Sequence, residues 1–273
     1  MNKAIFLLQD LDFSESEAKA YITLLKTGAV TGYELSKQSG VARSKIYNIL
    51  EQLREKGAVL VSKQSDPVLY SAIPSEELVK NYENNLKQKL AKIDDELCQF
   101  KNIESSEELW YIKGYQNIMN RCRYLIEQAE ESVLIQMWSD EKAALYDALL
   151  AFENRGGACA AIYYDESGHY DLDLANVYQH GFEEAMLKEN KGQRWINLVV
   201  DEKTLVFGHL NDQKHVEVLW TQHQPMVFLA KENIRHDVYC LRLLEMLDEN
   251  QRAQLGENML GIKKLFNKGE KEW

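Results

Sequence analysis

The sequence predicts a multidomain protein of mixed α+β and α/β class. Its 273 residues suit two domains joined by a connecting element. The N-terminal part shows helical patterns followed by a hairpin, the middle carries one long helical pattern, and strands alternate with helices from Leu109 onward. We therefore expect an N-terminal domain at residues 1–74, a connecting helix at 75–104 and an α/β domain at 105–273.

Two capping boxes mark the first helices of the N-terminal part. Ser14 precedes Glu17 by three residues, and Thr31 precedes Glu34 by the same spacing. In this motif the hydroxyl accepts the amide of the glutamate, and the carboxylate accepts the amide of the hydroxyl residue. Each helix is followed by a glycine suited to end it in a left-handed conformation, namely Gly28 and Gly40.

A third helix and a hairpin complete this module. Apolar residues at helical spacing, including Tyr47, run from Arg43 to Lys56 after a turn of only three residues. Residues 59–63 and 68–72 then read as strands around the turn at 64–67. Two short helices with a tight turn form a helix-turn-helix, and the hairpin adds a wing. The sequence thus predicts a winged helix-turn-helix.

The third helix of such a module enters the major groove of DNA. We expect double-stranded DNA as partner and assign its contacts to five side chains, namely Arg43, Ser44, Lys45, Asn48 and, on the wing, Lys63. The net charge of −11 argues against strong attraction to phosphate, but residues 1–66 hold nine Lys/Arg and eight Asp/Glu, so the acidity lies elsewhere. A module that binds protein only is the alternative.

The N-terminal sequence resembles the TrmB family of archaeal and bacterial transcriptional regulators. The matching motifs are Leu11–Ser14, Glu17–Tyr21, Leu24–Gly28, Ser39–Tyr47 and Leu53–Gly57, and the match continues through Pro67, Tyr70, Ala72, Ile73 and Pro74. The resemblance implies DNA binding and a dimer. One departure is Ala42, where the family often has proline, and this leaves the start of the third helix less rigid.

A long amphipathic helix is predicted from Ser75 to Phe100. Its apolar residues recur every three or four positions, at Leu78, Tyr82, Leu86, Leu90, Ile93, Leu97 and Phe100. This near-heptad stripe favours a two-stranded coiled coil and hence a homodimer that carries two winged helix-turn-helix modules. The alternative is that the stripe packs on the C-terminal domain of its own chain.

The C-terminal domain is predicted as an α/β sheet covered by helices. We expect strands at 109–113, 132–138, 159–165, 195–201, 205–210 and 216–221, and helices at 115–128, 141–154, 226–247 and 252–266.

The segments Asn197–Asp201 and Phe207–Gly208 look like the phospholipase-D-like domain that TrmB relatives carry. Active enzymes of that superfamily use an H-x-K-x-x-x-x-D motif with a histidine nucleophile. Counted back from Asp201, this chain has Arg194 at the histidine position and Ile196 at the lysine position. We therefore expect no catalytic residue and a sensor domain; the alternative function is a phospholipase-D-like phosphodiesterase with an N-terminal interaction module.

Aromatic and polar residues near the strand ends suggest a site for a small effector such as a sugar. The candidates are Trp138, Tyr164, Asp165, His169 and Trp220. Packing of these aromatics under a layer of helices is an equally open interpretation. Several TrmB relatives sense sugars, although many of them have an additional C-terminal β-rich segment that this chain is too short to include.

Other site types find little support. The four cysteines form no CxxC pair, and the six histidines are irregularly spaced, so we expect no metal and no cofactor. A long apolar run and a signal peptide are both missing, so we expect a cytoplasmic protein without membrane contact.

Overall fold

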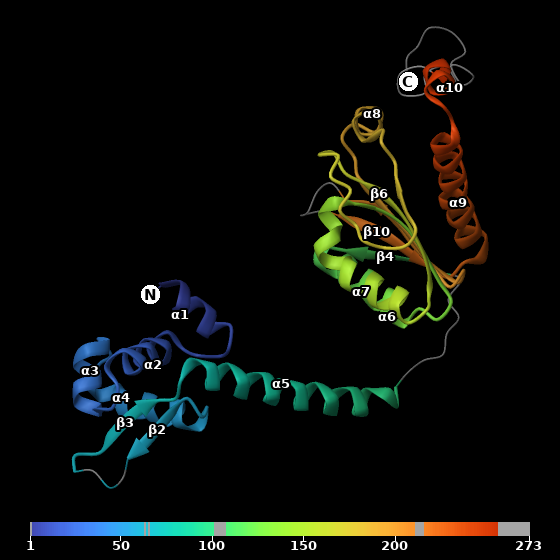
Figure 1. Cartoon of the computed structure of the whole chain (residues 1–273). Coiled ribbons are helices and arrows are strands. Elements are labelled where there is room, and N and C mark those ends of the chain that lie inside the picture. Colours follow the sequence, from blue (N-terminus) through green and yellow to red (C-terminus); the bar gives the residue numbers. More distant parts are fainter. Residues whose placement is uncertain (1, 63, 65, 101–107, 211–215, 256–273) are drawn as a thin grey trace. The chain divides into compact units, whose positions relative to one another are not determined.

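The computed structural model describes residues 2–62, 64, 66–100, 108–210 and 216–255. The chain divides into two compact units, Met1–Asn102 and Ile103–Trp273. Each unit has its own helices, sheet and core (Figure 1). Among the described residues, no helix is both long enough and apolar enough to cross a bilayer.

The first unit has the predicted order of three helices, a hairpin and a long helix. Its elements are α1 (Asn2–Gln9), α2 (Glu15–Thr27), β1 (Val30–Thr31), α3 (Gly32–Ser39), α4 (Arg43–Glu55), β2 (Val59–Ser62), β3 (Leu69–Ala72) and α5 (Ser75–Cys98). The strands form an antiparallel sheet in the order β1-β3-β2. The winged helix-turn-helix is therefore confirmed, whereas α1 and β1 were not predicted.

Both predicted capping boxes are present. The Ser14 hydroxyl accepts the Glu17 amide at 3.2 Å, and the Glu17 carboxylate accepts the Ser14 amide at 2.6 Å. Thr31 and Glu34 repeat the pattern at the start of α3. Gly40 adopts the left-handed conformation, as expected. The prediction for Gly28 is wrong in detail, because its φ of 77° is combined with a ψ of −153°, which leads the chain directly into β1.

The core of the first unit holds α4 against the other helices. The buried face of α4 consists of Ile46, Ile49, Leu50 and Leu53, and these pack with residues of α2 and α3. Lys56, directly after α4, donates to the Glu17 carboxylate of α2 at 2.9 Å. The Tyr21 hydroxyl of α2 donates to the carbonyl of Ile73, directly after β3, at 3.1 Å. Burial of its apolar face leaves the opposite side of α4 outward.

The second unit contains one mixed sheet of seven strands. Its elements are β4 (Leu109–Lys113), α6 (Tyr115–Gln128), β5 (Ser132–Trp138), η1 (Ser139–Glu141), α7 (Lys142–Asn154), β6 (Ala158–Tyr164), β7 (Val177–Gln179), α8 (Glu183–Glu189), β8 (Trp195–Val200), β9 (Thr204–His209), β10 (Glu217–Thr221), α9 (Gln224–Met246) and α10 (Glu249–Leu255). The strand order is β4-β10-β9-β8-β5-β6-β7.

Most predicted elements of this unit are confirmed within one or two residues, including β5 and α6 at their predicted bounds. The short elements β7 and α8 were not predicted. The last predicted helix, 252–266, is described only as far as Leu255, within α10, and the remainder lies outside the described residues.

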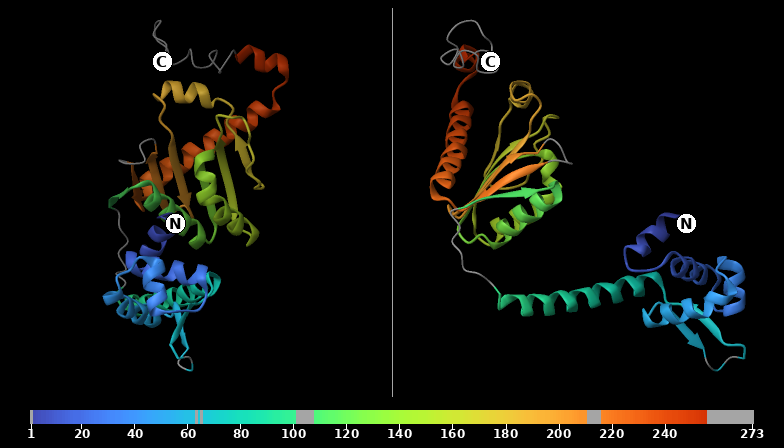
Figure 2. Two further views of the ribbon diagram at one scale, coloured as in Figure 1. Left: turned by 90° about the vertical axis from the view of Figure 1, so that its left-hand side faces the viewer. Right: turned by 180° about the vertical axis from the view of Figure 1, so that it is seen from behind.

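Helices cover both faces of the seven-stranded sheet (Figure 2). Alternate residues of each strand point to opposite faces. Val133, Ile135 and Met137 of β5 belong to the cluster under α6 and α7, whereas Leu134 and Trp138 pack in the cluster under α9. The parallel strands are β5, β6 and β7, and the remaining neighbours are antiparallel.

Asp201 connects the turn between β8 and β9 to the loop before β5. Its carboxylate accepts the amides of Glu130, Glu131 and Ser132 at 2.7–2.9 Å. Partial burial raises the pKa of this carboxyl, but the three amides outweigh burial and bring the pKa below its usual value.

We expect Asp201→Ala to lower the free energy of unfolding by about 1–3 kcal/mol, because the partly buried amide of Ser132 and the exposed amides of Glu130 and Glu131 lose a charged acceptor. The free energy of unfolding of Asp201→Asn should lie between those of the wild type and Asp201→Ala, since asparagine keeps one acceptor and tolerates the positive φ of 51° found here. Urea denaturation at pH 7 measures the change. The exposed Asp147→Ala is the control, and equal midpoints for Asp201→Ala and Asp147→Ala would contradict the interpretation.

Candidate functional site

The outward side of α4 carries the predicted DNA-contacting residues. All four are exposed and lie at or near the N-terminal end of the helix, namely Arg43, Ser44, Lys45 and Asn48. They alternate with the buried apolar residues of α4, so packing of one side of the helix presents the other to solvent. The fifth predicted residue, Lys63, lies outside the described residues.

The N-terminus of α4 has no side-chain cap. Ala42 precedes the helix, and the Lys45 amide bonds to the carbonyl of Ala42 at 2.8 Å. Helix N-termini attract anions because their first amides point outward and the helix dipole is positive there. The departure from proline at residue 42 leaves α4 starting at Arg43, as predicted.

Two tyrosines, which the sequence did not indicate as part of this surface, lie at its border. The Arg43 guanidinium lies over the Tyr33 ring, 4.8 Å from its centroid. Tyr47 was predicted with the apolar residues of the helix, but 55% of it is exposed. Its ring lies so close to Gly32 that a Cβ there would be 2.7 Å from Cε1. Gly32, at the start of α3, is the one feature of the sequence that could have indicated this contact, because a residue without a Cβ allows the Tyr47 ring to approach.

The predicted effector residues do not form one site. Trp138 and Tyr164 are buried and stacked, with ring centroids 4.9 Å apart, and they belong to the cluster under α9. Trp220 lies on the opposite face of the sheet, with the Arg121 guanidinium 4.4 Å from its ring centroid. The expectation of a common pocket for Trp220 and the others is therefore wrong. Strand alternation and the position of β10 in the sheet separate them.

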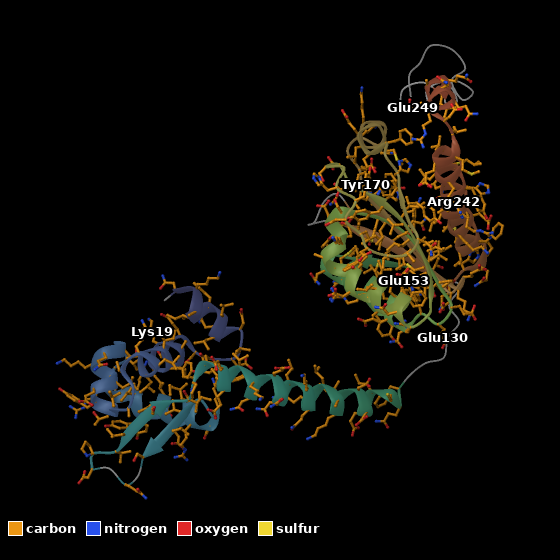
Figure 3. The ribbon with its side chains drawn as sticks, in the orientation of Figure 1. Lys19, Glu130, Glu153, Tyr170, Arg242 and Glu249 are labelled. Atoms are coloured by element: carbon orange, nitrogen blue, oxygen red, sulfur yellow. The ribbon has the colours of Figure 1, made fainter. Side chains whose placement is uncertain are left out.

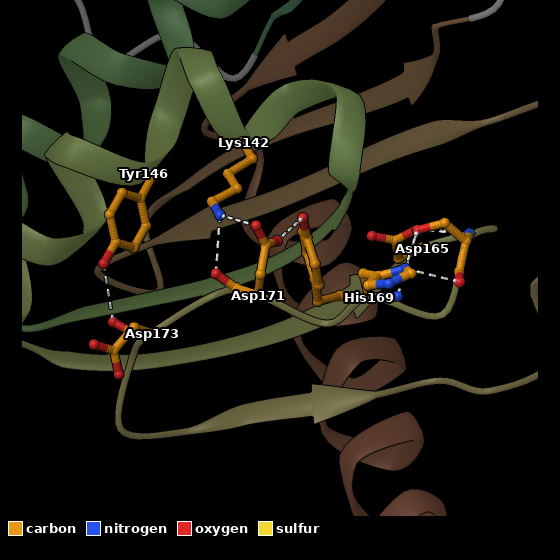
Figure 4. Close-up of polar contacts among 8 residues, drawn as sticks. Lys142, Tyr146, Asp165, His169, Asp171 and Asp173 are labelled. Atoms are coloured by element: carbon orange, nitrogen blue, oxygen red, sulfur yellow. Dashed lines mark hydrogen bonds and ion pairs between the residues drawn. The ribbon is translucent and has the colours of Figure 1, made fainter.

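Asp165 and His169 lie in the loop that follows β6 (Figure 4). The Asp165 carboxylate accepts the amide and hydroxyl of Ser167 at 2.7 and 2.6 Å. His169 is exposed, and its Nδ1 lies 3.1 Å from the carbonyl oxygen of Ser167. Asp165 thus orders the loop, while the imidazole remains accessible at the carboxyl ends of two parallel strands, β5 and β6.

The same loop is attached to α7. Lys142 donates to the Asp171 carboxylate at 2.6 Å and to its carbonyl at 2.9 Å, and the Tyr146 hydroxyl donates to the carbonyl of Asp173 at 3.4 Å (Figure 4). The bond from Lys142 lowers the pKa of Asp171, so this carboxylate is ionised at neutral pH.

The positions of the phospholipase-D motif are occupied by a salt bridge and a core residue. Arg194 pairs with Asp140 and lies 3.5 Å from the Glu141 carboxylate. Ile196 is fully buried in the cluster under α6 and α7. Asp201 accepts the three amides described above. This arrangement has no nucleophile at the expected position and instead serves to join β8 to η1.

Glu141 is the most perturbed carboxyl of this region. It is fully buried, and burial raises its pKa to about 7, although the nearby Arg194 opposes that shift. The Tyr115 hydroxyl donates to Oε1 at 3.3 Å, whereas Oε2 has no hydrogen-bond partner among the described residues. No sequence pattern indicated this residue, because its neighbours come from α6 and β8.

A buried polar row under α9 was also not predicted. The Gln136 side-chain amide donates to Asp237 at 2.6 Å, and Asn197 donates to Gln136 at 3.0 Å. Burial raises the pKa of Asp237, which the bond from Gln136 partly offsets. These bonds fix the position of α9 along β5 and β8.

Comparison with known proteins supports the resemblance seen in the sequence. The sequence profile described as "Sugar-specific transcriptional regulator TrmB" matches residues 8–76. The uncharacterized protein YrhO of Bacillus subtilis (strain 168) is 30% identical over 262 residues, which cover 96% of this chain and 94% of YrhO.

Two further similarities concern archaeal proteins. The HTH-type sugar sensing transcriptional regulator TrmBL1 of Pyrococcus furiosus is 30% identical over 131 residues, which are 47% of this chain but only 38% of TrmBL1. A solved structure of TrmBL2, described as an archaeal chromatin protein, covers 86% of this chain and 96% of its own, with 18% identity and a TM-score of 0.39.

We expect Glu141→Gln to change how stability depends on pH. The folded pKa of about 7 exceeds the ordinary value of 4.5, so the wild type loses stability as the pH rises from about 4.5 through 7. The loss amounts to about 3 kcal/mol at most. Relative to wild type, Glu141→Gln should therefore gain stability between pH 5 and pH 8 in urea denaturation. The exposed Glu166→Gln is the control, and parallel pH profiles for Glu141→Gln and wild type would contradict the assignment.

Proposed function

The chain belongs to the TrmB family of transcriptional regulators, and from this premise we propose that it binds double-stranded DNA as a homodimer, through α4, under the control of a small effector. The observation that carries DNA binding is the division of α4 into a buried apolar side and an exposed side with Arg43, Lys45 and Asn48. A helix fixed in this way can enter the major groove with its side chains already oriented.

The chemistry of the outward side chains suits base and phosphate contacts. Arg43 has the bidentate donors that match guanine, and Asn48 has the donor and acceptor that match adenine. Lys45 and Ser44 at the uncapped helix start fit neighbouring phosphates, and we propose the same role for Lys63, which follows β2 in the sequence. The stacking of Arg43 on Tyr33 restricts the guanidinium before DNA arrives and reduces the entropy lost on binding.

The homodimer is proposed to form along α5. Leu78 is buried in the first unit and Tyr82 packs beside it, so the start of the predicted stripe is anchored. The rest, named here the α5 stripe, is 52–73% exposed and consists of Leu86, Leu90, Ile93, Leu97 and Phe100. Among the described residues of this unit, no other helix or strand lies beside the C-terminal half of α5 (Figure 3). Five large apolar residues in one row are typical of a coiled-coil seam.

The effector is proposed to bind at the carboxyl ends of β5 and β6, over the loop of Asp165 and His169. Parallel strands commonly present their carboxyl ends to ligands. His169 is accessible there, and Trp138 and Tyr164 are the buried last residues of β5 and β6. A sugar is one candidate class, since aromatic faces and carboxylates suit it. We assign no phosphodiester chemistry to this unit, because Arg194 and Ile196 replace the catalytic pair.

We expect Arg43→Ala and Lys45→Ala each to weaken DNA binding by at least about 1 kcal/mol without changing the thermal midpoint. Each loses an exposed cation that contacts a base or phosphate. The probe is a duplex selected by the wild-type chain from a random pool, followed by fluorescence anisotropy at several salt concentrations. Lys87→Ala, on the polar side of α5 and paired with Glu83, is the charge-matched control. Binding by both α4 variants with unchanged affinity and salt dependence would reject the assignment.

We expect the double variant Leu90→Lys/Ile93→Lys to raise the dissociation constant of the dimer at least tenfold, because it places charges in the seam. Analytical ultracentrifugation measures it against the monomer mass of 31.6 kDa. Asn84→Lys/Ala91→Lys adds the same charges on the other side of α5 and should leave the dimer intact. A monomeric wild-type chain would favour the alternative in which the stripe packs on its own C-terminal unit.

A further inference from the structure

The strand β4 forms one end of the seven-stranded sheet and has an unusual surface for an edge. Among the described residues it pairs with β10 alone. Three consecutive side chains are 47–64% exposed, namely Leu109, Trp110 and Tyr111. The opposite edge is formed by β7, which has only three residues.

Free edges are normally protected from pairing with other chains. Natural proteins use short strands, prolines, bulges or charged side chains for this purpose. Within β4, the only charged residue is Lys113 at its end, and there is no proline. An exposed, apolar, five-residue antiparallel edge is therefore suited to accept another strand.

The backbone pairing shows which groups of β4 point away from the sheet. The Gly114 amide donates to the carbonyl of Val216 at 2.9 Å, in register with the pair Lys113 and Glu217. Because antiparallel residues alternate, even-numbered residues of β4 bond to β10. The amides and carbonyls of Leu109, Tyr111 and Lys113 therefore point outward.

This edge is complementary to itself. If two β4 strands run antiparallel with Tyr111 opposite Tyr111, Leu109 lies opposite Lys113, and all of these residues have outward-pointing backbone groups. The same register places Trp110 beside Ile112 of the other copy, on the face covered by α6. A two-fold axis through Tyr111 generates this pairing, as closed dimers require.

A shallow hollow lies next to β4. It has a volume of about 430 Å³ and is lined by Trp110, Ile112, Asn117, Arg121 and Trp220. The Nε1 of Trp220 is buried and has no hydrogen-bond partner among the described residues. In the self-paired register, the side chains of Trp110 and Ile112 from a second copy lie on the same face of the joined sheet as this hollow.

We propose that two copies of this chain join their β4 edges in this register, so that their seven-stranded sheets become continuous across the dimer. The length of chain before β4 favours a second copy as occupant. Ten residues separate Cys98 at the end of α5 from Leu109, and they span at most about 35 Å. Two chains paired along α5 therefore hold their β4 strands at high effective concentration. The high effective concentration rests on the proposed pairing of two chains along α5, whereas the register of the β4 strands does not.

The test uses full-length chains that carry Leu90→Lys/Ile93→Lys, with and without Tyr111→Pro. Proline at 111 removes an outward amide that β10 does not use, so the sheet of each copy should be retained. Sedimentation velocity should show residual self-association of the α5 variant, and Tyr111→Pro should weaken it at least tenfold. Tyr111→Thr keeps the amide and is the matched control; it should self-associate more strongly than Tyr111→Pro.

Amide hydrogen exchange of the wild-type chain gives a second measurement that needs no variant. The amides of Leu109 and Tyr111 should exchange at least tenfold more slowly at concentrations where the dimer forms than where it is dissociated. Exchange at these amides that is independent of concentration would overturn the proposal, as would equal association of Tyr111→Pro and Tyr111→Thr. Weakening by Tyr111→Pro with no effect of Leu90→Lys/Ile93→Lys would retain the β4 contact and reject the α5 seam.

Discussion

The packing of one side of α4 determines what the first unit presents to a partner. Ile46, Leu50 and Leu53 are fully or almost fully buried, so rotation of the helix about its axis would expose large apolar area. Each such side chain contributes about 1.5–3 kcal/mol on burial. The charged side is consequently fixed outward without any cap at Ala42. The position of the exposed, charged side of α4 therefore follows from the packing of its buried side.

The first unit is nearly neutral, so a single copy has little electrostatic attraction for DNA. A regulator with such a head gains affinity mainly by presenting two heads together, because the second contact is then intramolecular. The first unit leaves the α5 stripe exposed, and the second unit leaves the β4 edge exposed. The two surfaces are close in the sequence, because β4 is the first strand after α5. Pairing at both places would link the spacing of the heads to the arrangement of the sheets.

Local signals explain what the sequence could predict. Ser14 and Thr31 act on amides three residues away, and the alternation in β5 lies within seven residues, so these elements were predicted closely. The elements α1, β1, β7 and α8 are short, and the strands β1 and β7 also depend on pairing with partners distant in sequence. The prediction that the effector residues share one site was wrong for the same reason. Only the folded sheet shows that Trp138 and Trp220 lie on opposite faces.

An effector can regulate only by binding two arrangements of the protein with different affinity. The loop at His169 is connected to the rest of its unit through Lys142 and Tyr146 of α7. The start of α7 adjoins Glu141, a buried carboxyl with a pKa of about 7, and its partner Arg194. Displacing Lys142 would therefore disturb a charge pair that is already expensive to bury. This makes the α7 start, rather than the closed aromatic cluster of Trp138, the element best placed to respond to a ligand.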